Sequence, residues 1–444
     1  MSEAFDVVVV GGGPGGSVCA ARLAQGGAKV LVLEKERFPR FHLGESLLPQ
    51  SLPVLEAIGV LAEVEATFIP KYGARFHDDA LGRKDRFSFD GAWKNDRDHS
   101  FEVPRDRFDQ VLLDHAQRLG VEVRQEWSVT GAVREGERVV GVLARAPDGT
   151  DTRFDAKYVV DASGRDALFA HAARSTEKII DLDQTAIFMH YEGVSRPEGK
   201  LAGDIDIVIF RESPNARPNW FWMIPFKDGR TSVGAVVSKA WMKEHRAKLD
   251  ASAVAQRDPG ELVSGDSGDP RGDELTALFD MAVNESRSAT ELLAGAKKLW
   301  PRAQAAADFS YRVRELVGEG WVAVGDAAGF IDPLFSTGAH IAMCGGKAAA
   351  DTLLELLAPG GAVDEAKKLK AWETMIRSGA ETFILAVQAF YAGPLMEAIF
   401  AENKHNALRR SITSLLAGDV FHDSVWLRDT KLRLREMAER PTGR

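Results

Sequence analysis

A run of four valines leads directly into a glycine-rich segment near the start of the chain. Val7–Val10 is followed by Gly-Gly-Gly-Pro-Gly-Gly at Gly11–Gly16. β-Branched apolar residues favour a buried parallel strand, and the glycines favour a tight turn into a helix. Ser17–Gln25 contains good helix formers, a glycine pair ends the helix, and Lys29–Leu33 predicts a second strand. Glu34 then lies about 20 residues beyond the glycines, which is the spacing of dinucleotide-binding folds.

Each part of this segment has a role in binding a dinucleotide. Gly11 permits the tight turn, Gly13 lets the backbone approach a pyrophosphate, and Gly16 lets the helix pack closely on the strand. The helix N-terminus offers free N–H groups to the phosphates, and Glu34 can accept hydrogen bonds from a ribose diol. The expected cofactor contacts of this unit are Gly11, Gly13, Pro14, Gly15, Gly16, Ser17, Glu34 and Lys35. The alternative is a glycine-rich turn in an α/β protein that binds nothing.

Length and charge limit the remaining possibilities. The 444 residues are enough for two or three lobes with substantial cores. A formal net charge of −9 argues against nucleic acid as a general partner. Two cysteines, Cys19 and Cys344, provide neither a disulfide framework nor a metal cluster, so we expect no metal site. No apolar run is long enough to span a membrane and no signal peptide fits, so we expect a cytoplasmic protein without a membrane partner.

Two later segments are predicted to return the chain to the same sheet. Tyr158–Arg165 predicts a buried strand that ends at Asp161 in a turn of small residues. Gly320–Ala328 predicts another strand, which ends in Gly325-Asp326. Turns at the carboxyl edge of a parallel sheet bring backbone close to the ligand, and an acid there can accept a ribitol or ribose hydroxyl.

The regions between and after these strands have other periodicities. Residues 184–238 alternate with period two, which predicts a second, mostly antiparallel sheet. We expect one helix over Ser51–Glu65, and a mainly helical region over 239–307 with a mobile polar loop near Asp258–Asp273. The chain from Val363 onward is expected to be helical.

Four local features have both a structural and a functional interpretation. Lys71, at the start of an expected strand, would ordinarily be a solvated surface charge. In Trp220–Pro225, alternation places Trp220 and Trp222 on one face, which is most often a core stripe. The segment Phe330–Gly338 leads into a helix whose first N–H groups can face an anion or a ring edge. The basic C-terminal residues form a solvated face or dock an acidic partner; they are Arg428, Lys431, Arg433, Arg435, Arg440 and Arg444.

These motifs together resemble a known family. The glycine segment with Glu34, Asp161–Arg165 and Gly325-Asp326-Ala327 resemble the FAD-binding fold of the p-hydroxybenzoate-hydroxylase type, through about residue 350. That superfamily contains aromatic hydroxylases, geranylgeranyl-type reductases and flavin-dependent halogenases. Trp220–Pro225 is similar to the halogenase signature W-x-W-x-I-P, and Phe330–Gly338 to the signature F-x-x-P-x-x-S-x-G.

Two shorter matches support the same family. Lys71, in Pro-Lys-Tyr-Gly, resembles the active-site lysine of the halogenases, and Gly44-Glu45-Ser46 with Pro49 is typical of them, although reductase relatives share it. The chain resembles the phenol and pyrrole halogenases more than the tryptophan halogenases, because it is shorter and its tryptophan signature falls earlier.

The resemblance implies a fold with three parts. It is an α/β (α+β) protein with a Rossmann-like FAD-binding domain, an antiparallel-sheet substrate domain and a helical C-terminal region. The expected boundaries are 1–75, 103–180 and 308–358 for the FAD-binding domain, 76–102 and 181–307 for the substrate domain, and 359–444 for the helical region.

The resemblance also implies a reaction. A separate flavin reductase supplies FADH2, which with O2 and chloride or bromide yields hypohalous acid. Lys71 carries the halogen as a haloamine, or hydrogen-bonds the hypohalous acid, and an electron-rich phenolic or pyrrolic substrate attacks it. The substrate is a free small molecule or an acyl group on a carrier protein, and the hypothesis is that an acidic carrier protein docks on the basic C-terminal helix.

The implied site residues extend the set given above. The further cofactor contacts are Glu45, Ser46, Arg105, Asp161, Gly325, Asp326, Pro333 and Gly338. On the substrate and halide side they are Trp220, Trp222, Pro225, Phe330, Ser336, Thr337 and Gly338. The sequence contains a single nucleotide fingerprint, which fits a separate reductase.

Three other functions fit the same fold. A single-component FAD monooxygenase would oxidise NAD(P)H unaided and ignore halide. A flavin reductase of isoprenoid double bonds would need no O2. A non-catalytic flavoprotein would bind FAD and produce nothing.

Overall fold

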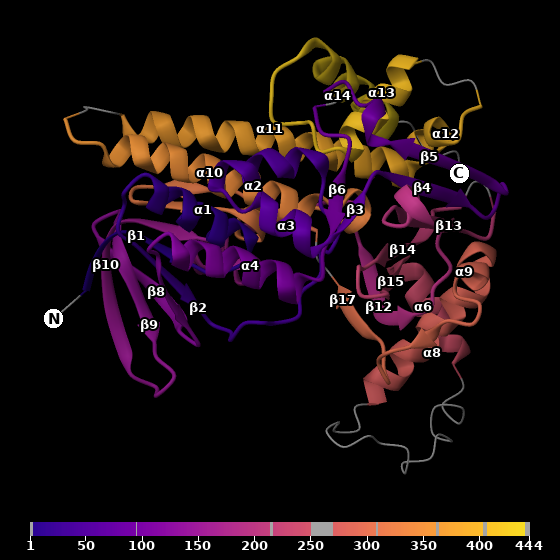
Figure 1. Cartoon of the computed structure of the whole chain (residues 1–444), viewed down its shortest axis with the longest axis horizontal. Helices are drawn as coiled ribbons and strands as arrows, with labels where there is room; N and C mark the ends of the chain where they lie inside the picture. The colour runs from indigo at the N-terminus through magenta and orange to yellow at the C-terminus, as the bar shows by residue number, and fades with distance from the viewer. Residues whose placement is uncertain are drawn as a thin grey trace.

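Two main sheets lie toward opposite ends of the molecule, and two long helices connect the regions around them (Figure 1). The computed structural model describes residues 3–94, 96–213, 216–249, 270–307, 310–360, 364–402 and 406–439. The predicted polar loop near Asp258–Asp273 lies mostly outside these residues. Among the helices formed by the described residues, none has a stretch long and apolar enough to cross a membrane.

The first sheet contains the valine-rich strand and is mainly parallel. Strands β20, β10, β1, β2 and β7 pair in this order, all in parallel, and β8, β9 and β19 extend the sheet with antiparallel pairs. The strands are β1 (Glu3–Val10), β2 (Val30–Glu34), β7 (Glu122–Gln125), β8 (Ser128–Glu135), β9 (Arg138–Arg145), β10 (Asp151–Asp161), β19 (Val317–Gly318) and β20 (Trp321–Ala323). The register aligns Val10 with Asp161, and Asp161 with Ala323. The carboxyl ends of three strands therefore meet at one edge, as predicted.

The second sheet is mostly antiparallel, also as predicted. Its order is β16, β12, β15, β14, β13, β4 and β5, with β17 also paired to β12, and only β13 and β4 run parallel. The strands are β4 (Gly73–Asp78), β5 (Arg83–Ser88), β12 (Gln184–Glu192), β13 (Ile205–Phe210), β14 (Asn219–Pro225), β15 (Arg230–Ser238), β16 (Lys297–Lys298) and β17 (Gln304–Ala307). The described residues of 239–307 are mainly helical, as expected, except for these last two strands, which complete the edge beside β12.

Two smaller sheets connect the main ones. Strand β3 (Ile69–Lys71) pairs with β6 (Ser100–Glu102), and β18 (Tyr311–Val313) pairs with β11 (Thr176–Lys178) and β21 (Gly329–Phe330). Lys71 thus ends a short strand and does not start the longer one that follows.

Helices cover both sheets. They are α1 (Pro14–Gln25), α2 (Leu52–Ile58), α3 (Leu61–Thr67), α4 (Arg105–Arg118), α5 (Leu168–Ala172), α6 (Lys239–Lys248), α8 (Pro270–Glu285), α9 (Arg287–Leu292), α10 (Thr337–Leu357), α11 (Glu365–Ala392), α12 (Pro394–Ile399), α13 (Asn406–Leu416) and α14 (Val425–Ala438). The single helix expected over Ser51–Glu65 is two helices, because Gly59 adopts a left-handed conformation (φ +87°) that ends α2.

Helix α11 contributes to the cores of both sheets. Its N-terminal half, with Trp372, packs in the same core as the valines of β1. Its C-terminal half, with Phe383 and Tyr391, packs with Trp220 and Trp222 of β14. The three-part division of the chain stays a prediction, and α11 shows that the helical region shares its core with both other parts.

Candidate functional site

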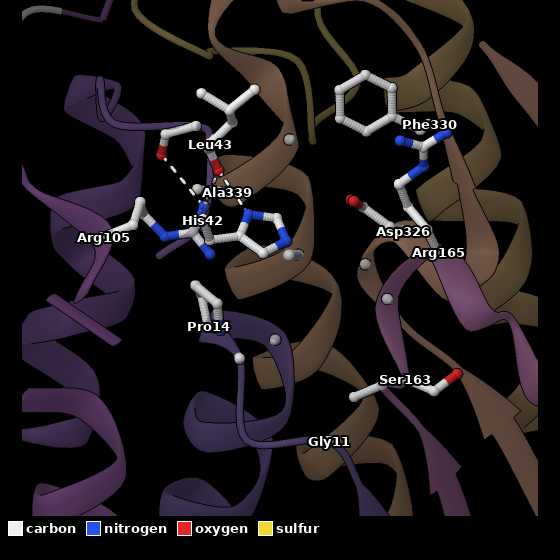
Figure 2. A pocket seen from close by; sticks show the side chains of 18 of the residues that line it. Gly11, Pro14, His42, Leu43, Arg105, Ser163, Arg165, Asp326, Phe330 and Ala339 are labelled. Carbon is white, nitrogen blue, oxygen red and sulfur yellow. Dashed lines mark hydrogen bonds between the residues drawn. The ribbon is translucent and has the colours of Figure 1, made fainter. Parts of the chain in front are cut away.

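A cavity of about 640 Å³ lies where the carboxyl edge of the first sheet faces the second sheet. The glycine turn and the start of α10 line one part of it, and Ile205, Ile207, Trp222 and Ile224 of the second sheet line another. Figure 2 shows Gly11 and Pro14 beside α10, with Arg105 and His42 across the cavity from Asp326 and Arg165.

Most of the predicted site residues line this cavity. They are Gly11, Gly13, Pro14, Gly15, Glu34, Lys35, Glu45, Ser46, Arg105, Trp222, Gly325, Asp326, Phe330, Pro333, Ser336, Thr337 and Gly338. Six predicted residues lie outside its lining, namely Gly16, Ser17, Lys71, Asp161, Trp220 and Pro225.

The glycine turn has the close backbone contacts that its sequence predicts. Gly11 has φ +102°, and a Cβ on it would lie 2.3 Å from the Ala162 carbonyl oxygen. A Cβ on Gly16 would lie 2.0 Å from the Gly11 carbonyl oxygen. At Gly13 the nearest atom to a Cβ would be a guanidinium nitrogen of Arg40, 3.5 Å away. Gly11 and Gly16 are therefore required by packing, whereas Gly13 leaves open space at the cavity wall.

Glu34 joins the turn to the end of β2. Its Oε2 accepts the Gly12 N–H at 2.7 Å and its Oε1 accepts the Glu36 N–H at 2.8 Å. Ser17 also stabilises this turn, since its hydroxyl donates to the Gly12 carbonyl at 2.7 Å. Glu34 keeps free lone pairs toward the cavity, because a carboxylate can accept about four hydrogen bonds.

The two acids at strand ends differ in position. Asp161 is fully buried and accepts hydrogen bonds from the Ser163 and Phe169 N–H groups, at 3.1 and 3.0 Å, so it holds the turn after β10. Asp326 lines the cavity, where burial raises its pKa to about 6, against the opposing effect of Arg105 and Arg165. Asp326 is thus the strand-end acid that can reach a ligand.

Arg105 fixes the loop that closes one side of the cavity. Its guanidinium binds Asp109 at 2.7 and 2.9 Å and donates to the Leu43 carbonyl at 2.5 Å (Figure 2). Next to it, burial lowers the pKa of His42 to about 4, so this ring is neutral near pH 7. His42 lies in a loop outside helices and strands, and no spacing in the sequence distinguishes it.

The two tryptophans of β14 have different surroundings, so each interpretation applies to one of them. Trp220 is fully buried in the core, and its Nε1 donates to the Tyr391 hydroxyl at 2.9 Å, which donates to Asp332 at 3.2 Å. Trp222 lines the cavity, and its Nε1 donates to the Ser232 hydroxyl at 3.1 Å. Burial raises the pKa of Asp332 to about 7.

The segment before α10 meets the cavity at a helix N-terminus. Asp332 caps a short turn by accepting the Leu334 N–H at 2.9 Å. Ser336, with φ +55°, then sets the chain into α10, which starts at Thr337. The first N–H groups of a helix have no intrahelical partner, and here Thr337 and Gly338 line the cavity.

Lys71 is buried, which corrects the interpretation of a solvated strand residue. Only 1% of its surface is exposed, and its ammonium donates to the Ser46 hydroxyl at 2.7 Å. Burial lowers the pKa of Lys71, while the charges of Glu102 and Asp204 raise it. Ser46 lines the cavity, so Lys71 lies directly behind the cavity wall.

Glu102 is the residue near Lys71 that sequence reasoning missed. It ends β6, the partner strand of β3, and it is fully buried. Burial raises its pKa to about 8. The only signal in the sequence is an acid between two apolar residues, Phe101 and Val103, at a strand position.

Comparisons with known proteins identify the class of this site. Residues 4–258 match the family described as FAD binding domain. This family match agrees with the geometry of the site, because the glycine turn, Glu34 and Asp326 line one cavity.

The similar proteins narrow this class. The chain is 31% identical, over 94% of its length and 90% of the relative's, to the 1H-pyrrole-2-carbonyl-[peptidyl-carrier protein] chlorinase of Pseudomonas fluorescens. It is 28% identical, over 98% of its length and 97% of the relative's, to the corresponding brominase of Pseudoalteromonas luteoviolacea. The solved structure of the flavin-dependent brominase Bmp2 superimposes with a TM-score of 0.81, at 26% identity, covering 98% of both chains.

The chain is therefore an FAD-binding enzyme of the flavin oxidoreductase class. It belongs to the flavin-dependent halogenases, and the family predicted from the sequence is confirmed.

Proposed function

We propose that this halogenase uses FADH2 from a separate flavin reductase, O2 and a halide, and that Lys71 delivers the halogen to an electron-rich aromatic ring. The observation that carries this proposal is the position of Lys71. A buried ammonium, 2.7 Å from a hydroxyl of the cavity wall, is a rare and costly arrangement outside functional sites.

The cavity residues would hold FAD in a defined orientation. Gly13 and Pro14 would face the pyrophosphate at the start of α1, and Glu34 would accept ribose hydroxyls. Asp326 would accept a hydroxyl farther along the cofactor. When bound, reduced FAD supplies the electrons with which O2 and halide give hypohalous acid. The roles of Lys35, Arg105 and Asp161 toward FAD stay predictions.

The start of α10 would hold the halide. Thr337 and Gly338 open this helix at the cavity, and an anion is stabilised by free N–H groups and by the helix dipole. Phe330 and Trp222 give this end of the cavity apolar walls, which exclude water from a reactive halogen species.

Lys71 can act in two ways from its position behind Ser46. As a neutral amine it would form a haloamine with hypohalous acid, and as an ammonium it would hydrogen-bond the acid and make the halogen more electrophilic. The lowered pKa of Lys71 favours the neutral amine more than in a solvated lysine, whereas its hydrogen bond to Ser46 fixes the direction of the Nζ atom.

We propose that the substrate is a pyrrolic or phenolic acyl group carried on a carrier protein. This rests on the names of the two relatives, both of which act on a pyrrole-2-carbonyl group on a peptidyl carrier. The aliphatic wall formed by Ile205, Ile207 and Ile224 suits a flat ring. A cytoplasmic location stays a prediction.

The proposed dock for such a carrier is the C-terminal helix α14. Its charges are partly used within the chain, because Arg435 pairs with Glu381 at 2.9 Å and Lys431 donates to Ser378. Arg433 is exposed, and with Arg435 it is the part of α14 most able to meet an acidic surface. Arg440 and Arg444 lie outside the described residues.

The test is a halide-dependence assay on the full chain. The protein is incubated with FAD, an unrelated flavin reductase, NADH and O2, with chloride, bromide or neither. The acceptors are pyrrolyl carrier protein, free pyrrole-2-carboxylate and a phenol. We expect a mass shift of one halogen that needs halide and is lost in Lys71→Met, but is kept in Lys84→Met, which removes an exposed lysine of β5.

FAD binding by Lys71→Met, followed by flavin fluorescence, shows whether the variant keeps its cofactor site. Addition of one oxygen without halide, or NADH oxidation without the added reductase, would contradict the proposal and support a single-component hydroxylase. If free pyrrole-2-carboxylate is halogenated as fast as the pyrrolyl group on the carrier protein, only the proposal of a carrier-bound substrate is contradicted, and the halogenation reaction is not.

A further inference from the structure

A second ionisable group, Glu102, is buried beside Lys71. Glu102 is fully buried, and among the described residues neither of its carboxylate oxygens makes a hydrogen bond of good geometry. An ionised carboxylate in such a place is strongly disfavoured unless a cation or a proton compensates it. The structure therefore contains an acid that needs a proton or a positive charge at its own position.

The backbone places Ser46 and Lys71 on the two strand neighbours of β6, which carries Glu102. Ser46 forms a bridge with Glu102, and the neighbouring Leu47 N–H donates to the Phe101 carbonyl at 2.9 Å. Lys71 reaches the same point from β3, which pairs with the other side of β6. Its ammonium donates to Ser46, and proximity to the Ser46 hydroxyl lowers the pKa of Glu102. The Ser46 hydroxyl is thus bound by the amine and lies close enough to the acid to affect its pKa.

The other two acids around Lys71 each have at least one oxygen with a partner, although Oε2 of Glu45 is buried without one among the described residues. Asp204 accepts the Arg86 guanidinium at 2.6 Å and the Tyr72 N–H at 3.1 Å. Glu45, on the segment next to Ser46, lies 3.3 Å from the ring of His190. Among the described residues, Glu102 is the acid of this group for which neither carboxylate oxygen has a hydrogen-bond partner, and Lys71 is bound only through Ser46.

We propose that Glu102 is the positioning residue that exchanges a proton with Lys71 through Ser46, and so sets whether Lys71 meets hypohalous acid as an ammonium or as a neutral amine. In this exchange the proton leaves Nζ for the Ser46 oxygen, while the Ser46 proton moves to a carboxylate oxygen of Glu102. The total charge stays zero, so no net charge is created in the buried site.

The inference rests on the proposed function, which supplies the hypohalous acid. With the proton on Glu102, the Lys71 nitrogen attacks the halogen, the N–halogen bond forms and the halogen–oxygen bond breaks. The leaving hydroxide takes one proton from the nitrogen and becomes water. With the proton on Lys71, the ammonium is a hydrogen-bond donor instead.

The titration behaviour of both groups fits such an exchange. Burial raises the pKa of Glu102 to about 8 and lowers the pKa of Lys71. The two pKa values therefore move toward each other, which lowers the free energy of proton transfer from Lys71 to Glu102.

The first test is the pH dependence of stability, which needs no catalysis. Because the pKa of Glu102 rises from 4.5 to about 8 on folding, its contribution to stability is full below pH 4.5 and is lost as pH rises through about 8. Urea unfolding from pH 5 to 9 should show this loss in the native chain, and Glu102→Gln should remove it. In Lys71→Met the loss should move upward by about 1 pH unit or more, since a nearby positive charge is gone.

Asp332→Asn is the matched control. Asp332 is also a buried acid, with a pKa raised to about 7, but its partners are Tyr391 and the Leu334 N–H. The effects of Asp332→Asn and Lys71→Met should therefore add independently. If the effects of Glu102→Gln and Lys71→Met add in the same way, the inference is overturned. If Glu102→Gln does not fold, Ser46→Ala provides the same cycle with Lys71→Met.

The second test is the pH profile of kcat for halogenation. Glu102→Gln should shift the profile along the pH axis, and Glu102→Asp should restore part of the original shape. A uniform fall in kcat with an unchanged profile would mean that Glu102 is only structural. If the native chain forms no halogenated product at all, the proposed function fails, while the stability cycle still decides whether Glu102 and Lys71 titrate together.

Discussion

Alanine substitutions at Gly13 and Gly16 should separate cofactor binding from folding, although the two glycines are only three residues apart. Gly13 has extended backbone geometry (φ −67°, ψ −178°) and faces the cavity, so alanine can adopt its conformation. The nearest atom to the new Cβ is a guanidinium nitrogen of Arg40 at 3.5 Å, an ordinary contact. Gly13→Ala should therefore leave stability unchanged within about 0.5 kcal/mol.

Gly16→Ala should behave differently, because its Cβ would lie 2.0 Å from the Gly11 carbonyl oxygen. The backbone of α1 or of the turn must then move by more than 1 Å, judged against an ordinary contact of about 3.5 Å. Overpacking of this kind costs about 3 kcal/mol at the upper end of its usual range, and alanine returns about 1 kcal/mol of helix propensity. The expected net loss of stability is about 2 kcal/mol.

Both variants should bind FAD more weakly. At Gly13 the methyl group fills space that a pyrophosphate would use, and a tenfold loss of affinity corresponds to about 1.4 kcal/mol. Urea unfolding of the chain without FAD and titration with FAD give the two quantities separately. Gly131→Ala is the control, since a Cβ there meets nothing within 4 Å.

The reasoning is refuted if Gly13→Ala binds FAD as tightly as the native chain, because the turn would then not face the pyrophosphate. It is refuted equally if Gly16→Ala unfolds at the same urea concentration as Gly131→Ala.

Three further predictions concern the hydrogen-bonded residues Trp220, Tyr391 and Asp332, and the C-terminal helix α14. Tyr391→Phe should cost about 1–3 kcal/mol in urea unfolding, because it leaves the buried Trp220 Nε1 without its acceptor. Asp332→Asn should flatten the pH dependence of stability, because the pKa of Asp332 rises to about 7 on folding and its stabilising contribution is lost between about pH 4 and 7. Thermal unfolding followed by circular dichroism across that pH range measures the effect. An unchanged pH dependence in the variant would mean that Asp332 is not the group that titrates. Reversing the charges of both Arg433 and Arg435 should raise the KM for a carrier-bound acceptor several-fold and leave kcat on a free acceptor unchanged. An equal KM in the native chain and the variant would contradict α14 as the docking site of the carrier protein.

The nucleotide-binding part of the fold could be predicted because its information is local. The turn Gly11–Gly16, the strand before it and Glu34 lie within one short stretch, and each residue type has a conformational or packing reason. The two returning strands could be predicted as well, since each is a short apolar run that ends in a small-residue turn. Strand alternation was enough to put Trp220 and Trp222 on one face.

Elsewhere the prediction failed where long-range pairing decides the structure. The expected helical region up to residue 307 contains β16 and β17, which are strands only because β12 offers them a free edge. Alternation also could not tell that Trp220 would be covered by Tyr391 of α11 while Trp222 would face the cavity. These choices depend on elements more than 100 residues apart.

The position of Lys71, the proposed catalytic lysine, shows the same limit. In the sequence, a lysine at a strand end is most simply a solvated charge, and only the resemblance to a family argued otherwise. Its burial depends on β6 and on the two segments that pair with it: β3 on one side, and the chain around Ser46, which pairs with Glu102. The lysine is therefore placed by backbone pairing, with one hydroxyl and one unpartnered acid beside it. Because Glu102 is part of that pairing, the strand that buries the lysine also supplies the acid that we propose as its proton-exchange partner.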